Sequence, residues 1–233
     1  MIHPSLSALK ENLILLGINL KVKVFNLVEY GRVVTRYYSH FHFAKIDLAL
    51  LTSYLFSNPF VISKQFLAKK GESEIYTYGE TPLTTLELIA RNCEINRQDV
   101  VFELGCGRGR TCLWLNQIIG CSVVGFDFVP TFIEKGEKIK QRFCISGLSF
   151  RLEDFFQSDL KGASVIYLYG TCYSANEIRL LIDHLSKHPK GTTIITVSYA
   201  LTDFQPEAPF RIVKQFSAPF TWGKGEVYFQ KKI

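Results

Sequence analysis

The sequence lacks three features that would place it in a special class of protein. Its 233 residues include six cysteines but no CxxC pair, and no apolar run reaches the roughly 20 residues of a transmembrane helix. The longest nearly uninterrupted apolar run, Ile46–Phe56, has 11 residues, one of them Asp. No basic segment followed by an apolar one opens the chain, as in a secretory signal. We therefore expect a globular protein of a reducing cytoplasm, without disulfides or a membrane span.

The chain also has little excess of charge and no arrangement of metal ligands. Lys and Arg number 27 and Asp and Glu 21, which gives a net charge of +6. This excess suits an anionic partner but is too small and dispersed to establish one. His40 and His42, in "HFH", lie outside the expected core, and we find no other set of residues that we interpret as metal ligands, so we expect no metal site.

Two regions of the chain differ in pattern. Residues 1–74 mix apolar and basic residues without alternation and contain a break at Asn58-Pro59, which indicates a helical N-terminal extension or lid. Residues 75–233 alternate short apolar runs with amphipathic stretches, as βαβ units do. The predicted strands are 99–105, 122–127, 148–154, 163–170, 191–199, 210–216 and 225–232. We predict an α/β fold with a doubly wound, mostly parallel seven-strand sheet that ends in an antiparallel hairpin, its two strands separated by a loop over residues 217–224.

Three helices in the second region have clear start signals. Ser174 and Glu177 have the spacing of a capping box before an amphipathic helix that ends near residue 185. Pro130 opens a helix that runs to residue 143, whose charged residues we expect to form a solvated face. Thr81 is the expected N-cap of a third helix, with Pro82 at its first position.

The stretch "VVFELGCGRGR" (residues 100–110) predicts a binding site. Gly105, Gly107 and Gly109 follow a predicted strand and precede a helix, at the edge where doubly wound sheets bind ligands. Glycine permits a tight turn and a close approach of a ligand to the backbone. The next two predicted strands end at the acids Asp127 and Asp154. Glycines spaced G-x-G-x-G, followed by successive acids, suit a nucleoside ligand that has no pyrophosphate.

These segments resemble motifs of the class I S-adenosylmethionine (SAM)-dependent methyltransferases. The resemblance covers roughly residues 75–233: "FELGCGRG" looks like the first motif of that family, "VVGFDF" like the second and "LEDFF" like the third. It implies an enzyme that transfers a methyl group from SAM. It also implies that Glu103 and the backbone of residues 105–109 flank the methionine part of SAM and that Asp127 holds the ribose hydroxyls.

The same resemblance implies further contacts with SAM. Phe128 would lie against the adenine face, Asp154 would accept from the adenine amine, and the Phe155 amide would meet a ring nitrogen. The segment before the first strand often folds over the cofactor in this family, which would bring Tyr78, Glu80 or Thr81 near the methionine end; the alternative is a plain capped helix. The expected cofactor-binding residues are Tyr78, Thr81, Glu103, Gly105, Cys106, Gly107, Gly109, Asp127, Phe128, Asp154, Phe155 and Tyr169.

The acceptor of the methyl group is expected at the end of the fourth strand, in "YLYGTCYS". This segment lacks the Asn/Asp-Pro-Pro-Tyr-like motif of DNA and glutamine methyltransferases, which argues against adenine-amine and amide acceptors. Tyr169, Thr171 and Tyr173 are the candidate catalytic residues, because hydroxyls and aromatic faces suit an amine or cationic acceptor. No histidine motif accompanies Cys172, so we interpret it as a packing residue.

Several acceptors stay open. The fifth strand and the hairpin are similar to those of non-SET protein-lysine methyltransferases, although "YGTCYS" departs from their Asn-rich loop. A small-molecule N- or O-methyltransferase is an alternative, and RNA is a third acceptor. A non-catalytic SAM-binding protein and an aminopropyltransferase that uses decarboxylated SAM share the fold, but "YGTCYS" lacks the paired acids of the latter. The sequence leaves the oligomeric state open.

RNA would use the basic and aromatic residues of the N-terminal extension. The basic positions are Lys21, Lys23, Arg32, Arg36, Lys69 and Lys70, and the aromatic ones are Tyr30, Tyr37, Tyr38, Phe41 and Phe43. Basic side chains could follow phosphates and aromatic ones could stack on bases. We expect instead that these aromatic residues form a small core of the lid's own.

Overall fold

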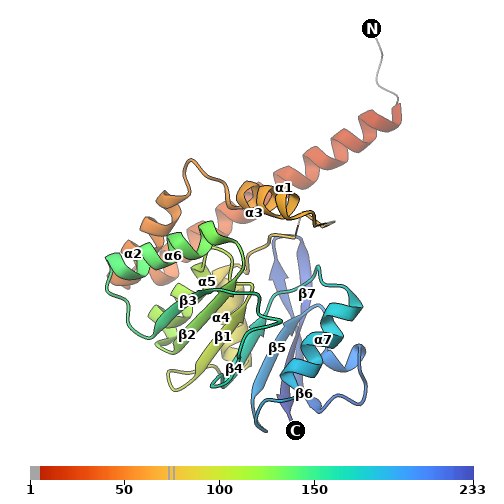
Figure 1. Cartoon of the computed structure of the whole chain (residues 1–233). Helices are drawn as coiled ribbons and strands as arrows, with labels where there is room; N and C mark the ends of the chain where they lie inside the picture. The colour runs from red at the N-terminus through yellow and green to blue at the C-terminus, as the bar shows by residue number, and fades with distance from the viewer. Residues whose placement is uncertain (1–5, 73, 76) are drawn as a thin grey trace.

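The sheet organises the fold (Figure 1). A computed structural model describes residues 6–72, 74, 75 and 77–233, and within them seven strands form one sheet in the order β3-β2-β1-β4-β5-β7-β6. The strands are β1 (Val100–Leu104), β2 (Ser122–Asp127), β3 (Leu148–Leu152), β4 (Val165–Leu168), β5 (Thr193–Val197), β6 (Phe210–Phe220) and β7 (Gly223–Lys232). Strands β1 to β5 pair in parallel, and β7 runs antiparallel to both β5 and β6. The predicted fold class is confirmed.

Helices cover both faces of the sheet. They are α4 (Leu83–Asn92), α5 (Arg110–Trp114), the π-helical turn η1 (Leu115–Ile119), α6 (Pro130–Arg142), α7 (Ala175–Leu185) and the 3-10 turn η2 (Leu201–Asp203). Successive residues of β1 point to opposite faces: Val101 belongs to the core under α4, α5 and α6, and Phe102 to the core under α7. The central strands are therefore buried on both sides, as their nearly continuous apolar sequence predicted.

The helix starts test the sequence signals directly. The capping box of α7 is confirmed: Ser174 Oγ accepts from the Glu177 amide at 3.3 Å, and Glu177 Oε2 accepts from the Ser174 amide at 2.7 Å. The prediction for Thr81 was wrong, because the N-cap of α4 is Pro82 and the Thr81 hydroxyl lies 2.5 Å from the Tyr167 hydroxyl instead. A buried partner on β4 thus outweighs the local capping preference.

Two further sequence expectations need correction. The hairpin loop is shorter than predicted, because β6 continues to Phe220 and β7 begins at Gly223, so Pro219 lies within a strand. The charged face of α6 is not merely solvated: Lys135 Nζ donates to the Ser53 carbonyl and to Ser57 Oγ, both at 2.6 Å. In both cases contacts with residues distant in the sequence order a segment that the local sequence predicted to be exposed to solvent.

The N-terminal region is helical, as predicted, in its described part. Its helices are α1 (Leu6–Tyr37), α2 (Phe41–Ser53) and α3 (Pro59–Lys70); residues 1–5 of the predicted extension lie outside the described residues. The break at Asn58-Pro59 is confirmed, since Asn58 Oδ1 caps α3 by accepting from the Phe60 amide at 2.9 Å. No helix among the described residues is long and apolar enough to cross a membrane.

The aromatic residues of this region do not form a core of their own. Tyr37 and Phe43 are buried in the main core, where the Tyr37 ring meets the Trp114 ring edge to face at 5.5 Å. Tyr30 and Phe41 are exposed instead. The expectation of a separate lid core was therefore wrong, because α2 and the end of α1 pack directly on α4 and α5. The division of the chain at residues 74 and 75 stays a prediction.

A buried ion pair fixes α2 to the glycine turn. Arg110 Nε and Nη2 donate to the two carboxylate oxygens of Asp47, each at 2.7 Å, and Asp47 is 1% exposed. The Tyr38 hydroxyl donates to the same carboxylate at 3.0 Å. Arg110 is the first residue of α5, so this pair joins the N-terminal helices to the segment that follows the glycines.

Replacing Asp47 by Asn should destabilise the protein strongly. The change leaves the Arg110 guanidinium buried without a carboxylate, which costs about 3–5 kcal/mol for buried pairs. Urea unfolding followed by circular dichroism measures the loss. Arg91→Ala is the control, because it removes an ion pair whose Arg91 side chain is 76% exposed, and such pairs contribute about 1 kcal/mol or less. Equal losses in the two variants would contradict a stabilising role for the buried pair.

Candidate functional site

The glycine turn at the end of β1 has the backbone that its sequence predicted. Gly105, Gly107 and Gly109 have φ values of 76°, 54° and 75°, a region that residues with a Cβ rarely adopt. The amides of Gly105 and Cys106 both donate to the Phe126 carbonyl at the end of β2. The three glycines differ in surroundings: a Cβ on Gly109 would overlap the Phe150 ring of β3, whereas one on Gly105 would have only the Tyr173 hydroxyl nearby, at 3.9 Å. The absence of a side chain at Gly109 therefore lets the Phe150 ring pack against the turn, whereas the absence of one at Gly105 leaves open space beside the backbone.

Asp127, the last residue of β2, accepts hydrogen bonds that connect the glycine turn to the start of α6. Its Oδ2 accepts from the Gly107 amide at 2.8 Å and its Oδ1 from the Val129 amide at 2.9 Å. Burial raises the pKa of this carboxyl to about 6, although the amide hydrogen bonds act in the opposite direction. The carboxylate thus faces the turn at the position from which the sequence predicted a ribose contact.

Glu103 lies one strand over, at the end of β1, and is also buried. Thr111 Oγ1 donates to its Oε1 at 2.5 Å and the Cys112 thiol to its Oε2 at 3.0 Å. Burial raises the pKa of Glu103 to about 7, and the two hydrogen bonds lower it only in part. A buried carboxyl that titrates near neutrality at the ligand-binding edge of the sheet is typical of a functional site.

A small cavity lies above these residues, which we call the glycine-turn pocket. It is lined by Gly79, Glu80, Thr81, Glu103, Gly105, Cys106, Arg108, Arg110, Thr111 and Tyr169. Its volume is about 20 Å³, whereas small-molecule sites generally measure about 300–1,000 Å³. A ligand as large as SAM therefore requires part of the lining to move.

Segment 77–81 closes the glycine-turn pocket. The Tyr78 ring lies against Gly107, where a Cβ would approach it to 3.0 Å. The Tyr78 hydroxyl donates to Glu80, and Arg108 Nη2 donates to Glu80 Oε2 at 2.7 Å. This segment is held by side-chain contacts across the turn rather than by strand pairing, so it is the part of the lining that can move with least loss of structure.

The remaining expected cofactor residues lie on two sides of the turn. Phe128 is partly exposed and lies under α3, with the Phe66 ring at 5.7 Å and Lys70 Nζ at 4.9 Å from its ring centroid. Asp154 is exposed, and its Oδ1 accepts from the Phe156 amide at 3.0 Å. Phe155 is buried beside Phe156. These positions surround the ends of β2 and β3, as the order of the sheet requires.

The three candidate catalytic residues separate in the structure. Tyr169 lines the glycine-turn pocket, and the Tyr173 hydroxyl lies near Gly105. Thr171 is exposed, does not line the pocket, and has the Cys172 sulfur as a neighbour at 3.7 Å. The geometry thus brings Tyr169 and Tyr173 to the turn and leaves Thr171 outside.

An aromatic stack beside the glycine-turn pocket was missed by the sequence analysis. The Tyr169 ring lies parallel to Phe220 at 5.3 Å, Phe220 lies parallel to Trp222 at 5.4 Å, and Trp222 Nε1 donates to the Tyr169 hydroxyl at 2.7 Å. Phe220 is the last residue of β6 and Trp222 lies in the β6–β7 turn, and both fall in the segment 217–224 that the sequence analysis treated only as a loop. Trp222 is 52% exposed, so the stack extends from the surface to the pocket.

The comparisons with known proteins agree with this geometry. Residues 95–208 match the model of a methyltransferase-domain family. An RNA methyltransferase from Salinibacter ruber, solved with S-adenosyl-L-homocysteine, has a similar structure, with 19% identity, a TM-score of 0.54 and coverage of 66% of this chain and 93% of that one. A geranyl diphosphate methyltransferase solved with GPP and sinefungin is 11% identical, with a TM-score of 0.56 and coverage of 65% and 78%.

A third similar structure extends further along the chain. A point mutant of MtNAS in complex with S-adenosylmethionine is 15% identical, with a TM-score of 0.53, and covers 81% of this chain and 72% of that one. A search of curated proteins found no match. The family model shows that residues 95–208 form a methyltransferase domain, and the similar structures show that the chain has the class I, Rossmann-like fold of SAM-dependent methyltransferases.

The raised pKa of Glu103 predicts a pH dependence of stability. Between about pH 5 and 7 the folded protein keeps a proton on this carboxyl that the unfolded chain has released, so the free energy of unfolding should fall as the pH rises through this range. Glu103→Gln should make the decrease in the free energy of unfolding smaller by about 1–3 kcal/mol, and the part of the decrease that is due to Asp127 should remain. Urea unfolding at pH 5, 6, 7 and 8 measures it. Identical pH profiles for the two proteins would contradict the assignment.

Proposed function

We propose that this methyltransferase transfers the methyl group of SAM to an amine, with the side chain of a protein lysine as the acceptor. The observation that carries the proposal is the stack of Tyr169, Phe220 and Trp222, which leads from the surface to the glycine turn. Aromatic faces attract ammonium and sulfonium groups and exclude water from them.

We propose that SAM binds over the glycine turn once segment 77–81 has moved away. Glu103 and the backbone of Gly105 and Gly107 would hold its methionine part, and Asp127 would accept from the ribose hydroxyls. Phe128, Asp154 and Phe155 would surround the adenine. The donor set supports this assignment, because two buried carboxyls and open backbone at Gly105 suit hydroxyl and ammonium groups.

The charges around the glycine-turn pocket are compatible with an amine acceptor. Arg108 and Arg110 line the pocket, and both are paired, Arg108 with Glu80 and Arg110 with Asp47. Neither arginine therefore presents an unneutralised positive charge to an approaching amine.

The transfer itself requires alignment more than acid or base catalysis. The lone pair of a neutral amine attacks the methyl carbon, the new N–C bond forms as the S–C bond breaks, and S-adenosylhomocysteine leaves; the amine then releases a proton to solvent. Residues that hold the nitrogen in line near ~3 Å from the methyl carbon contribute most. Tyr169 and Tyr173 are the positioning groups that we propose for this role.

The N-terminal helices belong to the same proposal. Phe60 of α3 meets the Tyr78 ring edge to face at 5.0 Å, so α3 lies next to the segment that closes the glycine-turn pocket. We propose that residues 1–74 cap the acceptor side of the site. Small-molecule and RNA acceptors are the alternatives, because similar folds occur in a geranyl diphosphate methyltransferase and an RNA methyltransferase.

Asp127→Ala should weaken SAM binding by about 1.5–3 kcal/mol, or about 10- to 150-fold, because hydrogen bonds to a charged group are lost. Isothermal titration calorimetry measures the affinity, and circular dichroism checks that the variant is folded. Asp183→Ala, an exposed position on α7, is the matched control and should bind as the native protein does. Native-like affinity of Asp127→Ala would contradict the ribose assignment.

Trp222→Ala should reduce methyl transfer to protein by about 2- to 30-fold while the affinity for SAM stays unchanged, because the aromatic entry is lost. The assay uses methyl-labelled SAM with protein, RNA and small-molecule fractions of a cell extract, and acid hydrolysis of the protein identifies methyllysine. Val213→Ala, exposed on β6, is the control. Label that appears only in RNA or in small molecules would overturn the lysine proposal and leave the SAM assignment intact.

A further inference from the structure

The positive charge of the chain is concentrated at its N-terminal end. Residues 1–70 contain nine of the 27 Lys and Arg residues but only three of the 21 Asp and Glu residues, which accounts for the whole net charge of +6. Residues 71–233 contain the other 18 of each and are neutral as a set. The N-terminal helices therefore form a basic end on an otherwise balanced domain.

Exposed apolar side chains gather in the same part of the molecule. Of the twenty large apolar side chains that are exposed among the described residues, fourteen lie between residues 16 and 61. The connection between α2 and α3 is the clearest case. We call four side chains of this connection and of the first turn of α3 the apolar tip: Leu55 is 70% exposed, Phe56 fully exposed, Phe60 57% and Val61 47% exposed. Soluble monomers rarely leave such a group uncovered, so the apolar tip indicates a contact surface.

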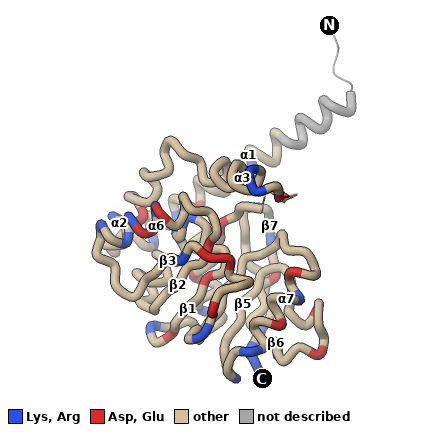
Figure 2. Tube along the Cα trace, viewed as in Figure 1, with Lys and Arg blue, Asp and Glu red and all other residues tan. Residues whose placement is uncertain are grey.

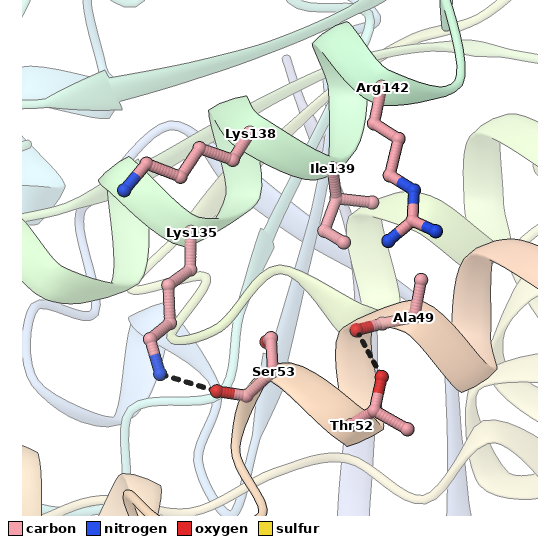
Figure 3. Close-up of a pocket in the computed structure, with 7 residues that line it drawn as sticks. All are labelled: Ala49, Thr52, Ser53, Lys135, Lys138, Ile139 and Arg142. Carbon is pink, nitrogen blue, oxygen red and sulfur yellow. Dashed lines mark hydrogen bonds between the residues drawn. The ribbon is translucent and has the colours of Figure 1, made fainter.

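A basic pocket lies between α2 and α6 (Figure 3), and α2 leads directly into the connection that carries Leu55 and Phe56. It is open, has a volume of about 300 Å³, and is lined by Ala49, Thr52, Ser53, Lys135, Lys138, Ile139 and Arg142. We call it the α6 pocket. Its three cations lie on one side of α6, and Figure 2 shows other Lys and Arg positions around α2 and α6. No Asp or Glu lines the pocket, so it favours an anion.

Two of the three cations are available to an anion. Lys135 is engaged: it donates to Ser53 and Ser57, and its Nζ lies 4.1 Å from the centre of the Tyr54 ring. Burial, together with the charge of Lys138, lowers the pKa of Lys135. Lys138 and Arg142 have no acidic partner in the described part of the chain. The bonds of Lys135 also fix the start of the α2–α3 connection beside the pocket.

We propose that the apolar tip and the α6 pocket together dock the protein on an anionic phospholipid surface. Leu55 and Phe56 insert among the headgroups, and Lys138 and Arg142 bind headgroup phosphates. A surface that combines exposed apolar side chains with basic side chains suits a lipid membrane better than RNA, because Leu55 and Phe56 make no favourable contact with the phosphates of RNA. It fits lipid better than a free phosphate ion, which would leave the apolar tip in water.

Vesicle binding by the full chain tests the proposal. Co-sedimentation with phosphatidylcholine vesicles, and with vesicles containing about 30% phosphatidylglycerol, should show binding to the second set only, weakened by high salt. The double variant Leu55→Ser, Phe56→Ser should bind at least about tenfold more weakly. Leu180→Ser with Val213→Ser, two exposed apolar residues elsewhere, should bind as the native protein does.

Charge-reversal variants test the α6 pocket. Lys138→Glu with Arg142→Glu should abolish the preference for anionic vesicles, whereas Lys187→Glu with Lys190→Glu, both exposed after α7, should retain it. SAM binding checks that each variant is folded. Equal binding to both vesicle types, native binding by the tip variant, or complete displacement from vesicles by inorganic phosphate or short single-stranded RNA would each overturn the proposal.

Discussion

The carboxylate of Asp127 is the contact on which the site depends. Its two oxygens accept from the amides of Gly107 and Val129, so one side chain joins the glycine turn after β1 to the entry of α6 after β2. Parallel neighbours in the sheet bring these two strand ends to the same edge, and the order β2-β1-β4 then places Tyr169 on the other side of the turn. The strand order thus determines which side chains lie near the glycine turn. The residues at the ends of β1, β2 and β4 determine which ligand groups the site can bind.

The site has a buried, hydrogen-bonded base and a cover that rests on it through side chains. Below the turn, Glu103 and Asp127 are buried and hydrogen bonded, and the Arg110–Asp47 pair ties the turn to α2. Above it, segment 77–81 rests on the turn through the Tyr78 ring and the Glu80–Arg108 pair. A large ligand that displaces segment 77–81 would replace these side-chain contacts with its own and leave the hydrogen bonds of Glu103 and Asp127 below the turn in place.

The sequence predicted the features that depend on local chemistry. The glycine turn, the seven strands, the capping box at Ser174 and the break at Asn58-Pro59 follow from residues close in the chain. The misses have tertiary causes. Thr81 bonds to Tyr167 on β4 rather than capping α4, and Tyr37 joins the core around Trp114. The stack of Trp222, Phe220 and Tyr169 forms because strand pairing brings the β6–β7 turn next to the end of β4. Neither residue propensity nor motif spacing in the sequence predicts that this turn and this strand end lie together.

The most direct test of the account is a calorimetric titration of the full chain with SAM, S-adenosylhomocysteine and NAD⁺. We expect micromolar binding of both adenosyl ligands and no binding of NAD⁺, because the glycine turn lacks the spacing that binds a pyrophosphate. Binding of NAD⁺ with no binding of SAM would contradict it. So would the absence of binding by all three, since the buried carboxyls at the ends of β1 and β2 would then serve only the fold.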